Sequence, residues 1–143
     1  MKVLFITIAM VFVGLTLFGQ QNTAVGHWLS ASGEGQIEIY NRADKLYGKI
    51  SWLKQPKDEQ GKPKTDLNNP DSKLRHKPLL GLEILKNFSI DGNGEWTGGT
   101  IYDPKSGKTY SCKLSLKKND QLHIRGYVGI SLLGKTEIWK RVK

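Results

Sequence analysis

The sequence predicts an all-β protein, an antiparallel barrel or sandwich of short strands, and three observations carry this prediction. Apolar and polar residues alternate with a period of two in several segments, as they do in strands that bury one face. Turn-forming residues recur between these segments, at a spacing of roughly ten residues. The 16 glycines and 38% hydrophobic residues suit a turn-rich β domain better than a helical bundle. A chain of 143 residues has room for one domain.

The N-terminus has the pattern of a secretory signal peptide. Lys2 precedes an apolar stretch, 3–18, and the small residue Gly19 and two glutamines follow it. A positive start, an apolar middle and a small residue before polar ones are typical of a cleaved export signal, and an uncleaved membrane anchor is the alternative. We therefore expect residues 1–20 to be removed and residues 21–143 to form a single domain, periplasmic or secreted. No cysteine lies near this boundary, so we do not expect a lipoprotein.

The predicted strands follow one another along the rest of the chain. In the clearest one, Leu122, Ile124 and Val128 alternate with His123 and Arg125. The alternating segments are 36–40, 46–53, 110–117, 122–130 and 135–142, with turn signals at 32–35, 91–94, 103–107 and 118–120.

The only cysteine, Cys112, cannot form a disulfide within the chain. It alternates in phase with Tyr110 and Leu114, and the residues between them are polar. We therefore expect its thiol to be buried on the apolar face of a strand rather than exposed and reactive.

A long polar segment, 55–78, interrupts the alternation. Segments of this length in a small domain are usually functional or disordered. Within it, Asn69 has the properties of a helix N-cap and Pro70 those of a first helical residue, which predicts a short helix that ends at Leu74 or Arg75. The apolar stretch that follows, residues 79–88, predicts a buried strand with a bend at Gly81.

Both ends of the predicted domain carry a pattern of aromatic and cationic residues. Gly26 and Trp28 open the first strand, and Trp139 and Arg141 close the last. This pattern is similar to that of the lipocalin-like (calycin) barrels, in which the first tryptophan closes the narrow end of the barrel and an arginine packs across its ring. The physical basis is the attraction of a guanidinium to an aromatic face, which is stronger where water is excluded.

The sequence also resembles the exported bacterial proteins of the DUF2147 family along most of its length. The matching stretches, in order, are LYGKI (46–50), GKPKTDLNNP (61–70), LLG (79–81), GGTIYDPKSGKTY (98–110), RGYVG (125–129) and WKR (139–141). The resemblance implies a lipocalin-like β-barrel and a signal peptide. Together with the pattern of strands and the predicted helix, it leads us to expect an antiparallel barrel of about eight strands with one short helix in a long loop. It implies no established activity and carries over no catalytic residues.

Several polar residues are candidates for contact with a ligand. Asp66 and Asn68 offer oxygen atoms in the long loop, but they suit turns and caps better than a calcium site, because no late bidentate glutamate follows them. Tyr102, Asp103 and Tyr110 surround a predicted hairpin turn, which we expect at the mouth of the barrel, where ligand sites often lie. Asp103 has a second interpretation as a cap of that turn.

Cationic side chains are candidates for binding an anionic group. Arg125 and Tyr127 share one face of a strand whose other face is apolar. If the apolar face forms the core, both side chains point to solvent; if the barrel holds a polar-headed ligand, Arg125 points inward and binds its anionic group. The sequence leaves both orientations open. Arg75, near the predicted helix end, is a second candidate.

Other chemistries lack the residues they need. The three histidines are scattered, and the sequence contains no zinc-ligand spacing, no nucleophile elbow and no phosphate-binding loop. We therefore expect no metal and no cofactor. The net charge of +9 is spread along the chain, which favours a soluble surface or peripheral contact with anionic envelope components. Nucleic acid is not an expected partner of an exported protein.

These observations favour an exported barrel that binds a small hydrophobic or amphipathic ligand, anionic ligands included. The segment 55–78 would act as a lid, and the polar end of the ligand would be held by Arg75 or Arg125 with Tyr102, Tyr110 or Tyr127. Two alternatives remain open. One is an envelope interaction protein whose barrel is filled by side chains and whose basic surface acts. The other is a small hydrolase or isomerase that uses Asp66 or Asp103. The sequence predicts no oligomeric state.

Overall fold

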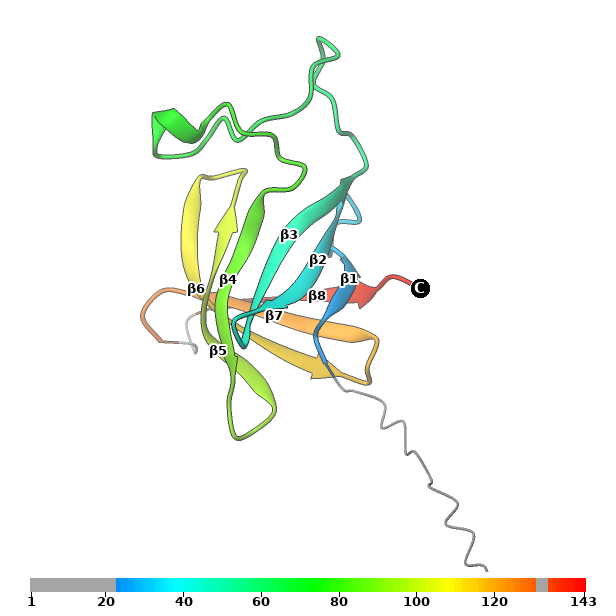
Figure 1. The fold of residues 1–143 in the computed structure, drawn as a ribbon, viewed down its shortest axis with the longest axis vertical. Helices are drawn as coiled ribbons and strands as arrows, with labels where there is room; N and C mark the ends of the chain where they lie inside the picture. Colours follow the sequence, from blue (N-terminus) through cyan, green and yellow to red (C-terminus); the bar gives the residue numbers. More distant parts are fainter. Residues whose placement is uncertain (1–22, 131–133) are drawn as a thin grey trace, which may run out of the picture.

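The fold is a closed antiparallel barrel of eight strands. The computed structural model describes residues 23–130 and 134–143. Each strand pairs with the next, and the last pairs with the first (Figure 1). The strands are β1 (Gly26–Leu29), β2 (Gly35–Arg42), β3 (Lys45–Leu53), β4 (Glu83–Ile90), β5 (Glu95–Asp103), β6 (Lys108–Lys117), β7 (Gln121–Tyr127) and β8 (Lys135–Arg141). The predicted all-β barrel is confirmed, and the predicted signal peptide lies outside the described residues.

The alternation that predicted the strands is the alternation between the inside and the outside of the barrel. In β7, for example, Leu122 and Ile124 are buried, while His123 and Arg125 are partly exposed. Cys112 is fully buried, as its position in the pattern predicted, and burial raises the pKa of its thiol to about 12. The inward side chains form one buried apolar cluster: Ala24, Trp28, Ile37, Ile39, Leu46, Ile50, Ile84, Leu85, Phe88, Trp96, Cys112, Leu114, Leu122, Ile124 and Trp139.

Two glycines make room for the large side chains of this cluster. A Cβ atom at Gly99 would lie only 2.5 Å from Cγ of Phe88, so the ring rests directly on the β5 backbone. A Cβ atom at Gly48 would lie 2.9 Å from Cδ1 of Leu85. Large side chains opposite glycines therefore occupy much of the space inside the barrel.

Arg141 closes one end of the barrel against Trp28. Its guanidinium carbon lies 4.3 Å from the centre of the Trp28 ring. The guanidinium also donates hydrogen bonds to the backbone oxygens of Asn119, Val25 and Thr23, over 2.6, 3.0 and 2.9 Å. Gly26 has a φ of +142°, and a Cβ there would lie 2.7 Å from the guanidinium. The packing of Arg141 across the ring of Trp28, which the resemblance to lipocalin-like barrels implied, is therefore confirmed.

The connection between β3 and β4 is a long loop, residues 54–82, that extends from the opposite end of the barrel (Figure 1). Its short helix is the 3-10 turn η1 (Ser72–Leu74), whose N-cap is Asp71, which accepts a hydrogen bond from the backbone N–H of Lys73 over 3.0 Å. The prediction of Asn69 as the N-cap and Pro70 as the first helical residue was therefore wrong. Asn69 instead bonds the backbone N–H of Asp71, which moves the helix start two residues along the chain.

Two smaller differences concern the neighbouring segments. The strand predicted at 79–88 begins at Glu83, because residues before it belong to the loop, and it continues to Ile90. Gly81 has a φ of +85°, as a bend requires, and its N–H bonds the backbone oxygen of Ile50. Within residues 23–130 and 134–143, no helix has the length and apolar character needed to cross a membrane.

Candidate functional site

The long loop is fixed to the barrel wall through a buried carboxylate. Asp66 is only 1% exposed, and both of its side-chain oxygens accept hydrogen bonds. The hydroxyl of Tyr102 on β5 donates to one oxygen over 2.7 Å, and the amide of Asn69 donates to the other over 2.8 Å. The backbone N–H of Asp66 bonds the oxygen of Lys77, so the two arms of the loop are joined at the same place.

A second contact holds the loop to the turn between β5 and β6. The amide nitrogen of Asn68 donates to the backbone oxygens of Pro104 and Lys105, over 3.1 and 3.0 Å. Gly107 in this turn has a φ of +73°, and a side chain there would collide with the backbone oxygen of Asn68. Figure 1 shows the loop passing over this hairpin. These contacts tie the loop to the barrel wall and to the β5–β6 turn, and we refer to the loop, residues 54–82, as the arch.

A cleft of about 600 Å³ lies between this arch and the outer face of the barrel wall. Strand alternation shows that the wall residues of the cleft lie on the outer face. Ile101 and Tyr110 pair with each other and point inward, so the next pair along the two strands, Tyr102 and Thr109, points outward. Pockets for small molecules span about 300–1,000 Å³, so the cleft has a suitable size. The cleft is lined by Asp66, Asn69, Pro70, Leu74, Lys77, Pro78, Leu80, Gly81, Leu82, Glu83, Lys86, Tyr102 and Thr109.

The two carboxylates of the cleft have hydrogen-bond or ion-pair partners, whereas its two lysines have no ion-pair partner in the described part of the chain. Asp66 holds its two hydrogen bonds, and Glu83 accepts from Tyr40 over 2.7 Å and forms an ion pair of 3.1 Å with Arg42. Among the described residues, Lys77 and Lys86 form no ion pair. The cleft therefore offers two ammonium groups that have no ion-pair partner among the described residues, beside an apolar lining from the loop.

Tyr102 is held in its neutral form at the edge of the cleft. Burial raises its pKa to about 12, and the hydrogen bond that it donates to the carboxylate of Asp66 adds to this effect. At ordinary pH the phenol is a hydrogen-bond donor to Asp66, which makes the pair a structural anchor.

The structure brings Asp66 and Tyr102 together at the cleft, but it separates the other candidate residues from it. Asp103 accepts hydrogen bonds from Lys105 N–H and the Ser106 hydroxyl, so it caps the turn, which is the second of its two interpretations. Arg75, the residue after η1, donates through Nε to the backbone oxygen of Asn69 over 2.8 Å and so supports the loop. Tyr110 is half-buried on the inward face of β6.

Arg125 and Tyr127 lie on the outer face of β7. Their neighbours Leu122 and Ile124 fill the inner face, and Arg125 donates a hydrogen bond of 2.8 Å to the hydroxyl of Thr136 on β8. Of the two orientations that the sequence left open, the structure has the outward one, so neither side chain reaches the interior or the cleft under the loop.

The sequence analysis did not identify the lysines and leucines of the cleft as candidate site residues. Lys77 and Lys86 are two of 22 cationic residues, and nothing in their local pattern marks them. Leu80 is 46% exposed, and its exposure was hidden by the apolar stretch that predicted a buried strand. Among the described residues, no group of three or more histidine, cysteine, aspartate or glutamate side chains could hold a metal ion.

Comparison with known proteins gives this barrel a family. The model of the family described as "Uncharacterized protein conserved in bacteria (DUF2147)" matches residues 26–141, which include every strand. The chain belongs to the DUF2147 family. No curated protein matches it.

A solved structure supports the fold of this DUF2147 protein. It is HP1028 from the human pathogen Helicobacter pylori, described as belonging to the lipocalin family. The two chains are 25% identical and superpose with a TM-score of 0.71, over 85% of this chain and 84% of that one. The lipocalin-like fold implied by the terminal tryptophan and arginine is therefore confirmed.

Proposed function

We propose that this DUF2147 protein is an exported binding protein that holds a small amphipathic ligand with an anionic head group. The ligand occupies the cleft under the long loop rather than the centre of the barrel, where Phe88 packs on Gly99 and Leu85 on Gly48. The observation that carries the proposal is the pairing of an apolar lining with two lysines that have no ion-pair partner among the described residues.

The chemistry of the lining divides the cleft into two parts. Leu74, Leu80 and Leu82 offer apolar surface, whose burial by a ligand contributes about 25 cal/mol per Å². The ammonium groups of Lys77 and Lys86 attract a carboxylate or phosphate, and the existing bonds of Asp66 and Glu83 leave these cations available. An anionic head group therefore gains more in this cleft than a neutral one.

The test uses residues 21–143 and compares decanoate with decanol in calorimetric titrations. We expect decanoate to bind at least about tenfold more tightly than the neutral alcohol, which corresponds to about 1.4 kcal/mol. The double variant Lys77→Gln/Lys86→Gln is expected to lose this preference. In a separate arm, native mass spectrometry of the protein purified gently from its own cells identifies the ligand it carries.

The control is the double variant Lys117→Gln/Lys140→Gln, which removes the same charge. Both lysines are exposed on strands at the other end of the barrel, near the β6–β7 turn. If the two double variants bind decanoate equally, the attraction is a property of the whole basic surface and the cleft is not the site. Equal binding of decanoate and decanol would also contradict the proposal.

A second candidate function is interaction with the cell envelope through the basic surface. It is favoured by the close packing of Phe88 on Gly99 and of Leu85 on Gly48, because these side chains take up space inside the barrel that a bound ligand would need. Association with anionic vesicles that falls steeply with salt, in a protein that carries no ligand by mass spectrometry, would support this alternative. Export itself is tested by locating the protein in cell fractions and sequencing its mature N-terminus.

A further inference from the structure

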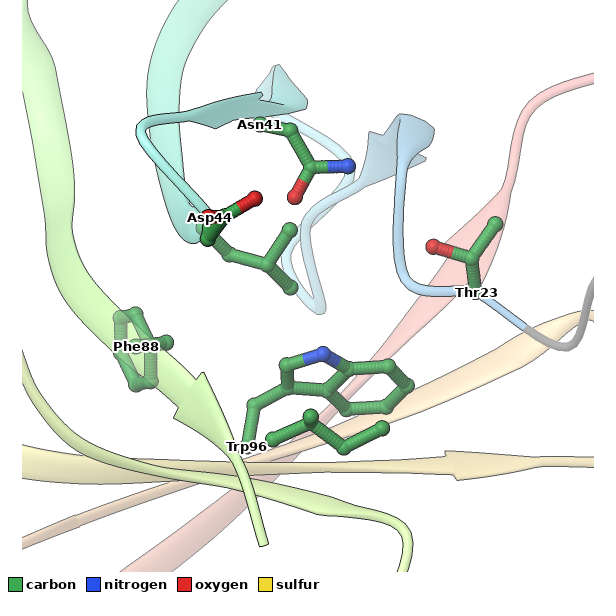
Figure 2. A pocket seen from close by; sticks show the side chains of 7 residues that line it. Thr23, Asn41, Asp44, Phe88 and Trp96 are labelled. Carbon is green, nitrogen blue, oxygen red and sulfur yellow. The ribbon is translucent and has the colours of Figure 1, made fainter.

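A second recess lies at the end of the barrel opposite the long loop. It has a volume of about 180 Å³ and is lined by Thr23, Asn41, Asp44, Leu46, Phe88, Ile90 and Trp96 (Figure 2). β3 begins beside this recess and ends at the long loop, so the recess and the cleft are separate sites. Its volume is below the usual range for drug-sized ligands, so it suits a molecule of only a few heavy atoms.

The floor of the recess contains a polar atom that lacks a partner. Trp96 is 6% exposed, and within residues 23–130 and 134–143 its indole N–H donates no hydrogen bond. Figure 2 shows this nitrogen directed into the recess, between Phe88 and the β2–β3 turn. This N–H is open to the recess, so it can donate to a ligand that brings an oxygen acceptor.

The rim carries a carboxylate that is also unengaged. Asp44 lies in the tight β2–β3 turn with a φ of +63°, a conformation that aspartate tolerates. Within the described part of the chain its side chain forms no ion pair and no hydrogen bond. Figure 2 places its carboxyl group and the amide of Asn41 above the indole, with Thr23 on the far side. Among the described residues that line the recess, Asp44 is the one that carries a charge.

The guanidinium that contacts Thr23 is already engaged. Arg141 donates to the backbone oxygens of Thr23 and Val25 and lies over the ring of Trp28. The recess therefore combines an acceptor-only group at the rim, a free donor on the floor and the apolar surfaces of Leu46 and Phe88 between them.

We propose that this recess binds a small organic ammonium ion that carries an oxygen atom close to its nitrogen, as an amino alcohol does. The ammonium group pairs with the carboxylate of Asp44, and the oxygen accepts from the indole N–H of Trp96. The carbon atoms between and around them lie on Leu46 and Phe88. The site does not depend on the ligand proposed for the cleft.

The experiment is a calorimetric titration of residues 21–143 with choline, followed by two simpler analogues. One analogue is the neutral alcohol in which carbon replaces the choline nitrogen, and the other is tetramethylammonium, which has no oxygen. We expect choline to bind with a Kd of about 1 mM and the neutral alcohol at least about tenfold more weakly. Asp44→Asn keeps the turn, because asparagine also tolerates positive φ, and is expected to weaken choline binding at least about tenfold.

Trp96→Phe tests the hydrogen bond separately from the charge. It is expected to weaken choline binding several-fold while leaving tetramethylammonium binding unchanged, a difference that a general loss of folding would not produce. The matched control is Asp120→Asn, an exposed aspartate in the β6–β7 turn, which is expected to bind choline like the wild type. Absence of choline binding, equal binding of the neutral alcohol, or an unaffected Asp44→Asn variant would each overturn the proposal.

Discussion

The anchor between Tyr102 and Asp66 gives the sharpest test of how the long loop is held. Replacing Tyr102 with phenylalanine removes one hydroxyl and leaves the ring, so the packing of the wall is preserved. The lost hydrogen bond is 2.7 Å long, and its acceptor, Asp66, is 1% exposed. Water therefore has little access to the oxygen that loses its donor.

The expected cost follows from the charge of the acceptor. A hydrogen bond to a charged group contributes about 1.5–3 kcal/mol, and the buried oxygen remains unsatisfied after the change. We expect Tyr102→Phe to lower the free energy of unfolding by about 2 kcal/mol. With a urea dependence of about 2 kcal/mol per molar for a domain of this size, the unfolding midpoint falls by about 1 M.

Urea unfolding followed by tryptophan fluorescence measures this change. The matched control is Tyr110→Phe, because the hydroxyl of Tyr110 has no hydrogen bond within the described residues, and its removal is expected to change the midpoint little. If the two variants unfold at the same urea concentration, the Tyr102 hydroxyl does not stabilise the loop and our account of the arch fails.

A titration of the tyrosines checks the same anchor without unfolding the protein. Burial and the Asp66 carboxylate raise the pKa of Tyr102 to about 12, above the ordinary value of about 10. Because the phenol keeps its proton more strongly in the folded protein, it contributes to the free energy of unfolding in full below about pH 10. This contribution is lost as the pH rises from about 10 through 12. Asp66→Asn is expected to lower the pKa only partly, because burial is the larger cause.

Three further predictions concern the barrel itself. Gly99→Ala is expected to destabilise the protein by about 1–3 kcal/mol in thermal or urea unfolding, because its Cβ would press on the ring of Phe88, whereas Gly92→Ala, with open space around it, should be nearly neutral. Since burial raises the pKa of Cys112 to about 12, its thiol should react with a disulfide reagent at pH 8 only in the unfolded protein, and rapid labelling of the native protein would contradict its burial. Arg141→Lys keeps the positive charge but cannot reproduce three hydrogen bonds to backbone oxygens, so a loss of about 2–3 kcal/mol is expected, and an unchanged unfolding curve would show that the ring contact alone closes the barrel.

The barrel was predictable because its information is local and periodic. The period of two marks which residues of each strand point inward, and it located Cys112 on the buried face. The contact between Trp28 and Arg141 joins residues far apart in the sequence, and the resemblance to lipocalin-like barrels supplied it where the period could not.

The binding surface was less predictable because it depends on where the loop lies. The outward direction of Arg125 follows from the closure of the whole barrel, which one strand does not reveal. The first residue of η1 depends on which side chain acts as the N-cap. Asn69 and Asp71 each accept a hydrogen bond from the backbone N–H two residues further on, and both residue types are common N-caps, so the sequence did not distinguish them. The sequence made Asp66 a candidate for a turn, for ligand contact and for catalysis, but only the folded chain places it against Tyr102.

The anchored loop has a consequence for ligand binding. A loop that is ordered before the ligand arrives loses little conformational freedom on binding, so more of the contact energy contributes to affinity. If this holds here, Tyr102→Phe weakens decanoate binding although the Tyr102 hydroxyl is already occupied by Asp66 and cannot bind the head group. The Lys77→Gln/Lys86→Gln variant behaves in the opposite way, because it lowers affinity without lowering the stability of the fold. If the cleft instead formed only when the ligand binds, the Tyr102–Asp66 hydrogen bond would be absent from the free protein. Tyr102→Phe would then lower the affinity for decanoate without lowering the stability of the free protein, as the lysine double variant does.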